Sequence, residues 1–182
     1  MRVPSRAAVR AGWIVVALIL AAVLIVIGTP DADGASPSQV RWNRTTVHVQ
    51  SALGDDWPVR VAVEAWDDSS ALDIVYSGTR CASTSCITIR WEDLPDWHLG
   101  YTNLYTDALG RYKACTIRVD PAAAALSDYL RLSLIRHETG HCFGFNHTYT
   151  GTDVMIETLR EGGPQNLSQF HKDRLLEVYP YA

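Results

Sequence analysis

The stretch "RHETGHCFGFNHTYTGTDVMI", residues 136–156, holds three of the six histidines in the chain. His137 and His141 are four residues apart, so in a helix both side chains leave the same face, one turn from each other. Two imidazoles placed in this way can bind a single zinc ion. The spacing therefore predicts a helix that carries two metal ligands.

A glycine and a third histidine follow this pair. A straight helix would carry His147 away from the metal, but Gly144 can adopt a positive φ at no steric cost and turn the chain back. Three neutral imidazoles leave the fourth tetrahedral position to water, which is typical of catalytic zinc sites. Glu138 lies about 100° round the helix from His137, where it can accept a proton from that water. We therefore expect Zn²⁺ on His137, His141 and His147, with Glu138 as the general base.

The elements predicted around this motif indicate an α+β domain. Alternating and β-branched runs predict strands at 45–50, 72–77, 86–91, 99–106 and 112–120. Apolar residues at helical spacing predict helices at 56–70, 127–144 and 167–180. The order strand, helix, strands, helix, helix is typical of an α+β fold, or of a mixed sheet with helices on its faces.

Individual positions in these helices carry further expectations. The expected helix caps are Asp56, Ser127 and Ser168. The expected buried residues of the first and last helices are Val59, Ala62, Val63, Trp66, Phe170, Leu175 and Val178. The remaining histidines His48, His98 and His171 are isolated in the sequence, so we expect them at the surface or in ordinary hydrogen bonds.

The first residues of the chain differ in composition from the rest. Three arginines, Arg2, Arg6 and Arg10, precede an unbroken apolar run from Ala11 to Gly28, a charge pattern that favours export of the remainder of the chain. The run exceeds a typical secretory core of roughly 7–15 residues and only just reaches a membrane span of about 17–25, so a cleaved signal peptide and a retained anchor are both open. The predicted division is a signal or anchor at 1–30, a linker at 31–39 and one extracytoplasmic domain at 40–182.

Four cysteines suit an exported domain, because oxidising compartments allow disulfides to form. We favour a bridge between Cys81 and Cys86 across the loop "CASTSC", and a second between Cys115 and Cys142. A cysteine zinc site is the weaker alternative, because the C-x4-C spacing lacks a second matching pair. The second alternative to the disulfides is that all four cysteines are free, buried thiols.

Residues 137–147, "HETGHCFGFNH", resemble the extended signature of the metzincin clan of zinc metallopeptidases, and most of all its matrixin-like and small secreted bacterial members. The resemblance implies a twisted mixed sheet of about five strands with a backing helix, an active-site helix and a C-terminal helix. It also implies a Met-turn at Met155, in "TDVMI", as an apolar floor beneath the metal. Some clan members place a tyrosine ligand two positions after this methionine, where the present chain has Glu157.

Together these features predict an exported zinc-dependent endopeptidase, in which zinc and Glu138 activate water against a peptide bond. The resemblance further implies that an edge strand pairs with an extended peptide, and segment 99–106 is the candidate. The alternatives are a catalytically inactive zinc-binding interaction module and a membrane-tethered regulator. A net charge of −4 with scattered basic residues disfavours nucleic-acid binding. We expect a monomer that contacts a membrane only through an uncleaved N-terminal segment.

Overall fold

The structure of the chain is a computed structural model. It describes residues 40–67, 72–78, 80–81, 84–95, 97–148, 153–162 and 166–180. The predicted signal or anchor and the linker, residues 1–39, lie outside the described residues. Within the described ranges, no helix combines the length and the apolar character that crossing a bilayer requires.

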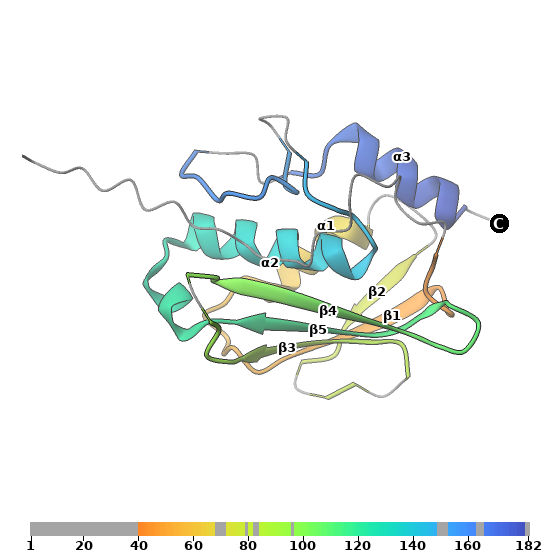
Figure 1. Cartoon of the computed structure of the whole chain (residues 1–182), viewed down its shortest axis with the longest axis horizontal. Helices are drawn as coiled ribbons and strands as arrows, with labels where there is room; N and C mark the ends of the chain where they lie inside the picture. Colours follow the sequence, from red (N-terminus) through yellow and green to blue (C-terminus); the bar gives the residue numbers. More distant parts are fainter. Residues whose placement is uncertain are drawn as a thin grey trace, which may run out of the picture.

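A mixed sheet of five strands forms one layer of the described part of the domain (Figure 1). Its strands are β1 (Thr46–Ser51), β2 (Asp73–Tyr76), β3 (Cys86–Trp91), β4 (Gly100–Thr106) and β5 (Tyr112–Val119). They lie in the order β2-β1-β3-β5-β4, and only β4 runs antiparallel to its neighbour. All five predicted strands are therefore present, and β4 lies at an edge of the sheet.

The α-helices lie on one side of this sheet (Figure 1). In the described residues they are α1 (Val59–Asp67), α2 (Asp128–Cys142) and α3 (Gln169–Val178), and a short 3-10 helix, Pro121–Ala125, precedes α2. Helix α1 and helix α2 pack against each other, and α2 also packs on β4 and β5. The α+β fold with a five-stranded mixed sheet is confirmed.

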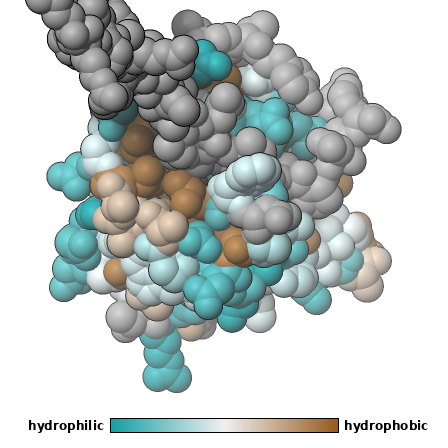
Figure 2. Space-filling model, turned by 60° about the vertical axis from the view of Figure 1, so that its left-hand side comes forward, coloured by the Kyte–Doolittle hydropathy of each residue, from teal (hydrophilic) through white to brown (hydrophobic). Residues whose placement is uncertain are grey.

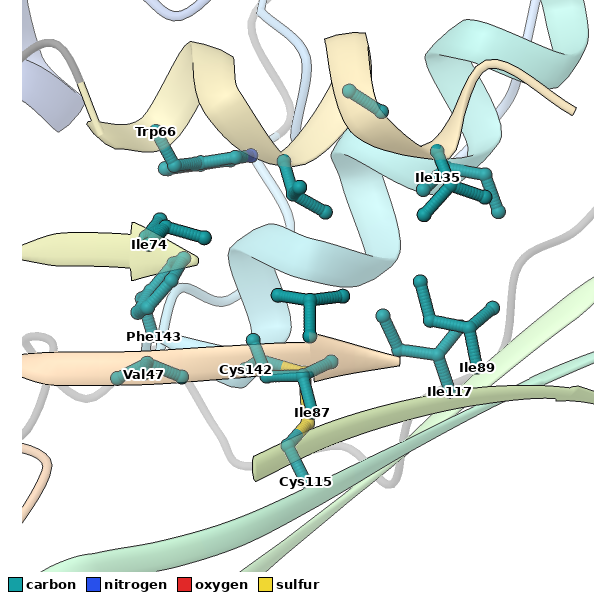
Figure 3. Close-up of a cluster of buried hydrophobic side chains, with 14 of the residues drawn as sticks. Val47, Trp66, Ile74, Ile87, Ile89, Cys115, Ile117, Ile135, Cys142 and Phe143 are labelled. Atoms are coloured by element: carbon teal, nitrogen blue, oxygen red, sulfur yellow. A yellow bond between two sulfur atoms is a disulfide. The ribbon is translucent and has the colours of Figure 1, made fainter. Parts of the chain in front are cut away.

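The core lies between the sheet and helices α1 and α2 (Figure 3). Alternate residues of the strands point to this side, because successive side chains of a strand leave opposite faces. Val47, Ile87 and Ile117 come from three neighbouring strands and are fully buried. Trp66 of α1 and Ile135 of α2 cover them from the helical layer. Burying one such side chain contributes about 1.5–3 kcal/mol, so this layer holds α2 firmly over the sheet.

Both favoured disulfides are present. Cys81 joins Cys86 with their Cα atoms 6.1 Å apart, and Cys115 joins Cys142 with their Cα atoms 5.7 Å apart. The second bridge links β5 to the last turn of α2 within the core (Figure 3). Two disulfides in a small domain are typical of proteins that work outside the reducing cytosol.

Two expectations about the helix starts need correction. Helix α1 begins at Val59, three residues after Asp56, so Asp56 is not its cap; instead its carboxylate lies 3.6 Å from Arg131. Ser168 occupies the N-cap position of α3, but its hydroxyl lies 3.0 Å from a ring nitrogen of His171 and makes no capping bond. Ser127 does cap α2, because its hydroxyl accepts a hydrogen bond from the backbone of Leu130 at 3.3 Å.

Helix α3 departs from the expected burial at one position, Phe170, and meets the core as expected at Leu175. Phe170, predicted to be buried, is 56% exposed, whereas His171 beside it is fully buried. Residues 171 and 175 are one turn apart, so a rotation that buries His171 also buries Leu175 and turns Phe170 outward. Val178 is partly buried against the core as expected. A polar side chain thus takes the place that the apolar pattern had assigned to phenylalanine.

The exposed apolar side chains come from separate elements. Figure 2 shows one face of the molecule, on which hydrophilic residues predominate and hydrophobic ones gather in the upper part of the coloured area. The exposed large apolar residues are Val61, Val75, Trp97, Tyr105, Leu109, Phe170 and Leu176. They belong to two helices, two strands and the loops on either side of β4, so no single element supplies them all.

Candidate metal centre

Helix α2 supplies two of the three predicted metal ligands. Its start is set by the Ser127 cap, and its buried face carries Leu134 and Ile135 onto the sheet. Because the helix continues unbroken to Cys142, His137 and His141 project one turn apart from the same side. Both side chains are buried. The rigid core beneath the helix therefore fixes where these imidazoles lie.

The third histidine arrives through a turn at Gly144. This residue has φ +81°, the left-handed conformation that ends many helices, and its backbone N–H donates to the carbonyl of His141 at 3.0 Å. A side chain here would also collide with Tyr112, since an added Cβ would lie 2.5 Å from the Tyr112 hydroxyl. The chain therefore reverses at Gly144 and brings His147 back toward the helix.

The three histidines converge through their Nε2 atoms. His137 and His141 have these atoms 3.0 Å apart, and His147 lies 3.2 Å from each of them. A tetrahedral ion with nitrogens at about 2.0–2.1 Å separates each nitrogen pair by about 3.3–3.4 Å, so the observed triangle fits a metal of zinc's size. Elsewhere in the described residues, no further group of three metal-ligating side chains converges in this way.

The protonation of these rings suits metal binding. Burial, and then the charges of His141 and His147, hold the pKa of His137 well below its ordinary value. Burial and His147 lower the pKa of His141 to about 3. Both rings are therefore neutral near pH 7, with a lone pair available for a cation.

Hydrogen bonds to the backbone orient two of the rings. Nδ1 of His137 lies 2.9 Å from the carbonyl of Val154, and Nδ1 of His141 lies 2.7 Å from the carbonyl of Phe145. A carbonyl only accepts, so each Nδ1 carries the proton and donates it there. This leaves each Nε2 unprotonated and aimed at the common centre, the arrangement that metal-binding histidines ordinarily have.

Glu138 lies between α2 and the edge strand. The hydroxyl of Thr102 on β4 donates to its Oε2 at 2.5 Å, while its Oε1 is buried without a hydrogen-bond partner among the described residues. Burial raises the pKa of Glu138 to about 8, although the bond from Thr102 opposes this rise. An added Cβ at Gly100 would lie 2.5 Å from Oε1, so a side chain there would displace the Glu138 carboxylate. When the carboxyl group is ionised, this unpartnered oxygen is suited to accept a proton from a water.

Met155 lies directly against the helix that carries the ligands. Its side chain is fully buried, and an added Cβ at Gly140 would collide with its sulfur. The turn that carries Met155 is closed by a hydrogen bond from the Ile156 backbone to the Asp153 carbonyl at 3.2 Å. Thr148 donates from its backbone to the Met155 carbonyl at 2.9 Å. The methionine thus forms an apolar support under the helix between His137 and His141.

Several residues of this centre were not predicted from the sequence. Thr102 and Gly100 come from a segment more than 30 residues before the motif, and Asp153 lies within the quoted stretch but faces His171, 18 residues further along the chain. Gly140 carried a usable signal, because glycine inside a helix costs about 1 kcal/mol relative to alanine and so needs a reason. The isolated histidines behave as expected at two places, where His48 lies 3.2 Å from the Ser77 hydroxyl and His98 lies 3.1 Å from the Pro95 carbonyl.

Comparison with known structures gives the same fold. The chain is similar to a structure of myroilysin with a TM-score of 0.53 at 16% identity, covering 86% of this chain and 95% of that one. A second myroilysin structure gives a TM-score of 0.55 at 16% identity and covers 86% of this chain and 91% of that one. No protein-family model and no curated protein sequence matches the chain. At this level of identity, the likeness to myroilysin shows a shared fold.

Proposed function

We propose that this protein is a zinc-dependent endopeptidase of the metzincin type. The observation that carries the proposal is the triangle of Nε2 atoms from His137, His141 and His147, with sides of 3.0–3.2 Å. Glu138 follows His137 directly on the same helix and keeps one carboxylate oxygen free of hydrogen bonds to the described residues. A purely structural zinc site needs no such carboxylate, whereas hydrolysis of a peptide bond does.

The chemistry divides between the metal and the carboxylate. Zinc, when bound, would polarise the scissile carbonyl and make a water more acidic. Glu138 accepts the proton of this water through Oε1 and passes it to the leaving amine. Thr102 holds Oε2, so the carboxylate presents one defined oxygen to the reaction. Met155 supports the helix from below and keeps the spacing of the ligands.

The substrate we propose is an extended peptide segment. Strand β4 is the edge of the described sheet, and its first residue, Gly100, lies against Glu138. A peptide that adds to this edge as a further strand would be held by backbone hydrogen bonds. Such pairing would bring its main chain past the carboxylate, whatever its side chains are.

The proposed location is outside the cytoplasm. The two disulfides support this location, and the arginine-flanked apolar run before residue 30 supports export. We propose a monomer whose membrane contact is limited to that N-terminal run where it is retained. Separating membrane and soluble fractions of cells that produce the full chain would distinguish an anchored from a released form.

Replacement of Glu138 by glutamine tests the proposed mechanism. Glutamine keeps the size of the side chain but cannot accept the proton, so hydrolysis of a peptide library should fall by a factor of about 10² or more. The bound zinc, measured by elemental analysis, should remain at one ion per chain. Unchanged hydrolysis with zinc bound would reject the mechanism. Absence of hydrolysis in the zinc-loaded wild type would favour the inactive zinc-binding module instead.

A further inference from the structure

His171 is a buried polar residue of the helical layer to which the proposed mechanism gives no role. It lies in the first turn of α3 and is fully buried. Its ring packs edge-on against Trp66 and Phe145, with ring centroids 5.8 Å and 4.6 Å away. Nε2 is buried and has no hydrogen-bond partner among the described residues. Phenylalanine would suit these apolar surroundings better, so the imidazole calls for a specific reason.

The polar side of the ring faces Asp153. Nδ1 of His171 lies 3.4 Å from Oδ2 of Asp153 and 3.0 Å from the hydroxyl of Ser168. A carboxylate beside Nδ1 favours the tautomer with its proton there, because the negative oxygen attracts the N–H dipole. Burial lowers the pKa of His171, and the charge of Asp153 opposes this. The ring is thus neutral near pH 7 and directs its N–H toward Ser168 and Asp153.

Asp153 in turn organises the Met-turn, residues 153–156. Its Oδ1 accepts a hydrogen bond from the backbone of Met155 at 2.8 Å, and its carbonyl accepts from the backbone of Ile156 at 3.2 Å. Aspartate commonly begins tight turns in this way. One carboxylate therefore uses one oxygen to hold the turn and the other to face α3.

The Met-turn contacts the metal centre at two points. The carbonyl of Val154 accepts the Nδ1 proton of His137 at 2.9 Å, which sets the orientation of that ligand. The sulfur of Met155 lies against Gly140, between the two ligands of α2. A shift of this turn would therefore change both the tilt of one imidazole and the support of the helix.

We propose that His171 is a positioning residue of the metal centre, which acts through Asp153 to hold the Met-turn against His137 and Gly140. The inference rests on the proposed zinc site and adds that the C-terminal helix α3 helps to position the metal ligands. It explains why a buried ring whose Nε2 has no partner among the described residues stands where an apolar side chain would pack more favourably. Outer contacts of metal-binding histidines commonly change metal affinity by about 10–100-fold.

The test measures zinc affinity of the purified full chain by competition with a chromophoric chelator. His171→Phe keeps the ring but removes the N–H, and we expect zinc to bind about tenfold more weakly. His171→Asn places an amide N–H near the position of Nδ1, so we expect affinity within about threefold of the wild type. A role in packing alone predicts the opposite ranking, because phenylalanine fills the site better than asparagine.

A second variant probes the same link from the other side. Asp153→Ser retains an oxygen that can accept from the Met155 backbone but removes the one that faces His171. We expect a similar, about tenfold, loss of zinc affinity, and no further loss when it is combined with His171→Phe. Leu176→Ala changes an exposed apolar residue of the same helix and serves as the control, with unchanged affinity.

The outcomes separate this inference from the proposed function. If the wild type binds no zinc, the proposed function fails. If the wild type binds zinc and His171→Phe and Asp153→Ser bind it equally well, the positioning role is rejected and the zinc site stands. If circular dichroism shows that His171→Phe does not fold, the test rests on Asp153→Ser and His171→Asn. The proposal then requires that Asp153→Ser binds zinc more weakly and that His171→Asn keeps the zinc affinity of the wild type. If the losses of zinc affinity in His171→Phe and Asp153→Ser add in the double variant, the two residues act independently, which also contradicts the proposal.

Discussion

The hydroxyl of Thr102 donates a 2.5 Å hydrogen bond to Oε2 of Glu138 and so joins the edge strand to the helix that bears the metal ligands. These residues are 36 positions apart in the chain. The bond restrains a carboxylate that burial would otherwise leave almost without polar contacts among the described residues. It also ties the strand proposed to pair with the substrate to the residue proposed to act on it.

Removing this bond should impair the general base. Thr102→Val keeps the shape of the side chain but loses the donor, and a hydrogen bond to a charged group contributes about 1.5–3 kcal/mol. Since the bond lowers the pKa of Glu138, its loss should raise that pKa and reduce the ionised fraction near pH 7. We expect kcat/KM to fall by about tenfold or more, measured with a fluorogenic peptide.

Thr116→Val is the matched control for that substitution. Thr116 lies on β5 and, unlike its buried neighbours Cys115 and Ile117, faces away from the helices. Thr116→Val makes the same chemical change on a strand as Thr102→Val but lies away from Glu138. The kcat/KM of Thr116→Val should therefore stay at the wild-type value. Equal losses in the two variants would show that Thr102 acts only through the stability of the sheet.

Gly140→Ala should destabilise the protein even though alanine is the better helix former. The gain in helix propensity is about 1 kcal/mol. An added Cβ would collide with the Met155 sulfur and lie 2.8 Å from the Trp66 ring, and overpacking of this kind costs about 1–3 kcal/mol or more. We expect a net loss in the free energy of unfolding, measured by urea denaturation. Adding Met155→Ala should recover part of the Gly140→Ala loss, and a purely additive double variant would argue against the contact.

The buried carboxylate should make metal-free protein less stable as pH rises. Burial raises the pKa of Glu138 from 4.5 to about 8, so between these values the folded state holds a proton that the unfolded chain has released. The contribution of Glu138 to the free energy of unfolding is therefore fully present below pH 4.5 and is lost as the pH rises to about 8. Glu138→Gln has no such proton, so it should gain stability relative to the wild type by up to about 1.4 kcal/mol per pH unit.

Urea unfolding in EDTA at about pH 5 and about pH 8 measures this difference. The three histidine ligands are present in both proteins, so the comparison isolates the change at Glu138. The free-energy difference between Glu138→Gln and wild type should be larger at the higher pH. A difference independent of pH would mean that Glu138 stays ionised throughout the range.

The bridge between β5 and α2 should matter more for stability than the bridge across the short loop. Cys115–Cys142 closes a separation of 27 residues and Cys81–Cys86 one of 5. Loop-closure entropy predicts losses of about 3.5 kcal/mol and about 2 kcal/mol when the respective pairs become serine. Thermal unfolding of the two double-serine variants gives the comparison. A larger loss for the Cys81–Cys86 pair would contradict this ranking.

Helix α3 shows where sequence patterns stop being sufficient. Its apolar residues predicted a buried Phe170, yet the helix is rotated so that His171 faces Trp66 and Phe145. Periodicity ranks side chains by their hydrophobicity and cannot weigh a polar partner on another segment. Asp153 is such a partner, 18 positions earlier in the chain, and its contact with His171 exists only once the Met-turn and α3 pack together.

The sequence by itself determined the elements of the fold and the identity of the candidate ligands, while it only favoured the disulfide pairs that the structure shows. It could do so because strand alternation, helical spacing and the turn at Gly144 are local, and each follows from backbone geometry over a few residues. The tertiary structure alone decided which residues surround that site: Thr102 and Gly100 contact Glu138, Met155 lies against Gly140, and His171 faces Asp153. These contacts depend on how the packed core sets α2 against the edge strand and α3 against the Met-turn, and no local pattern encodes that placement.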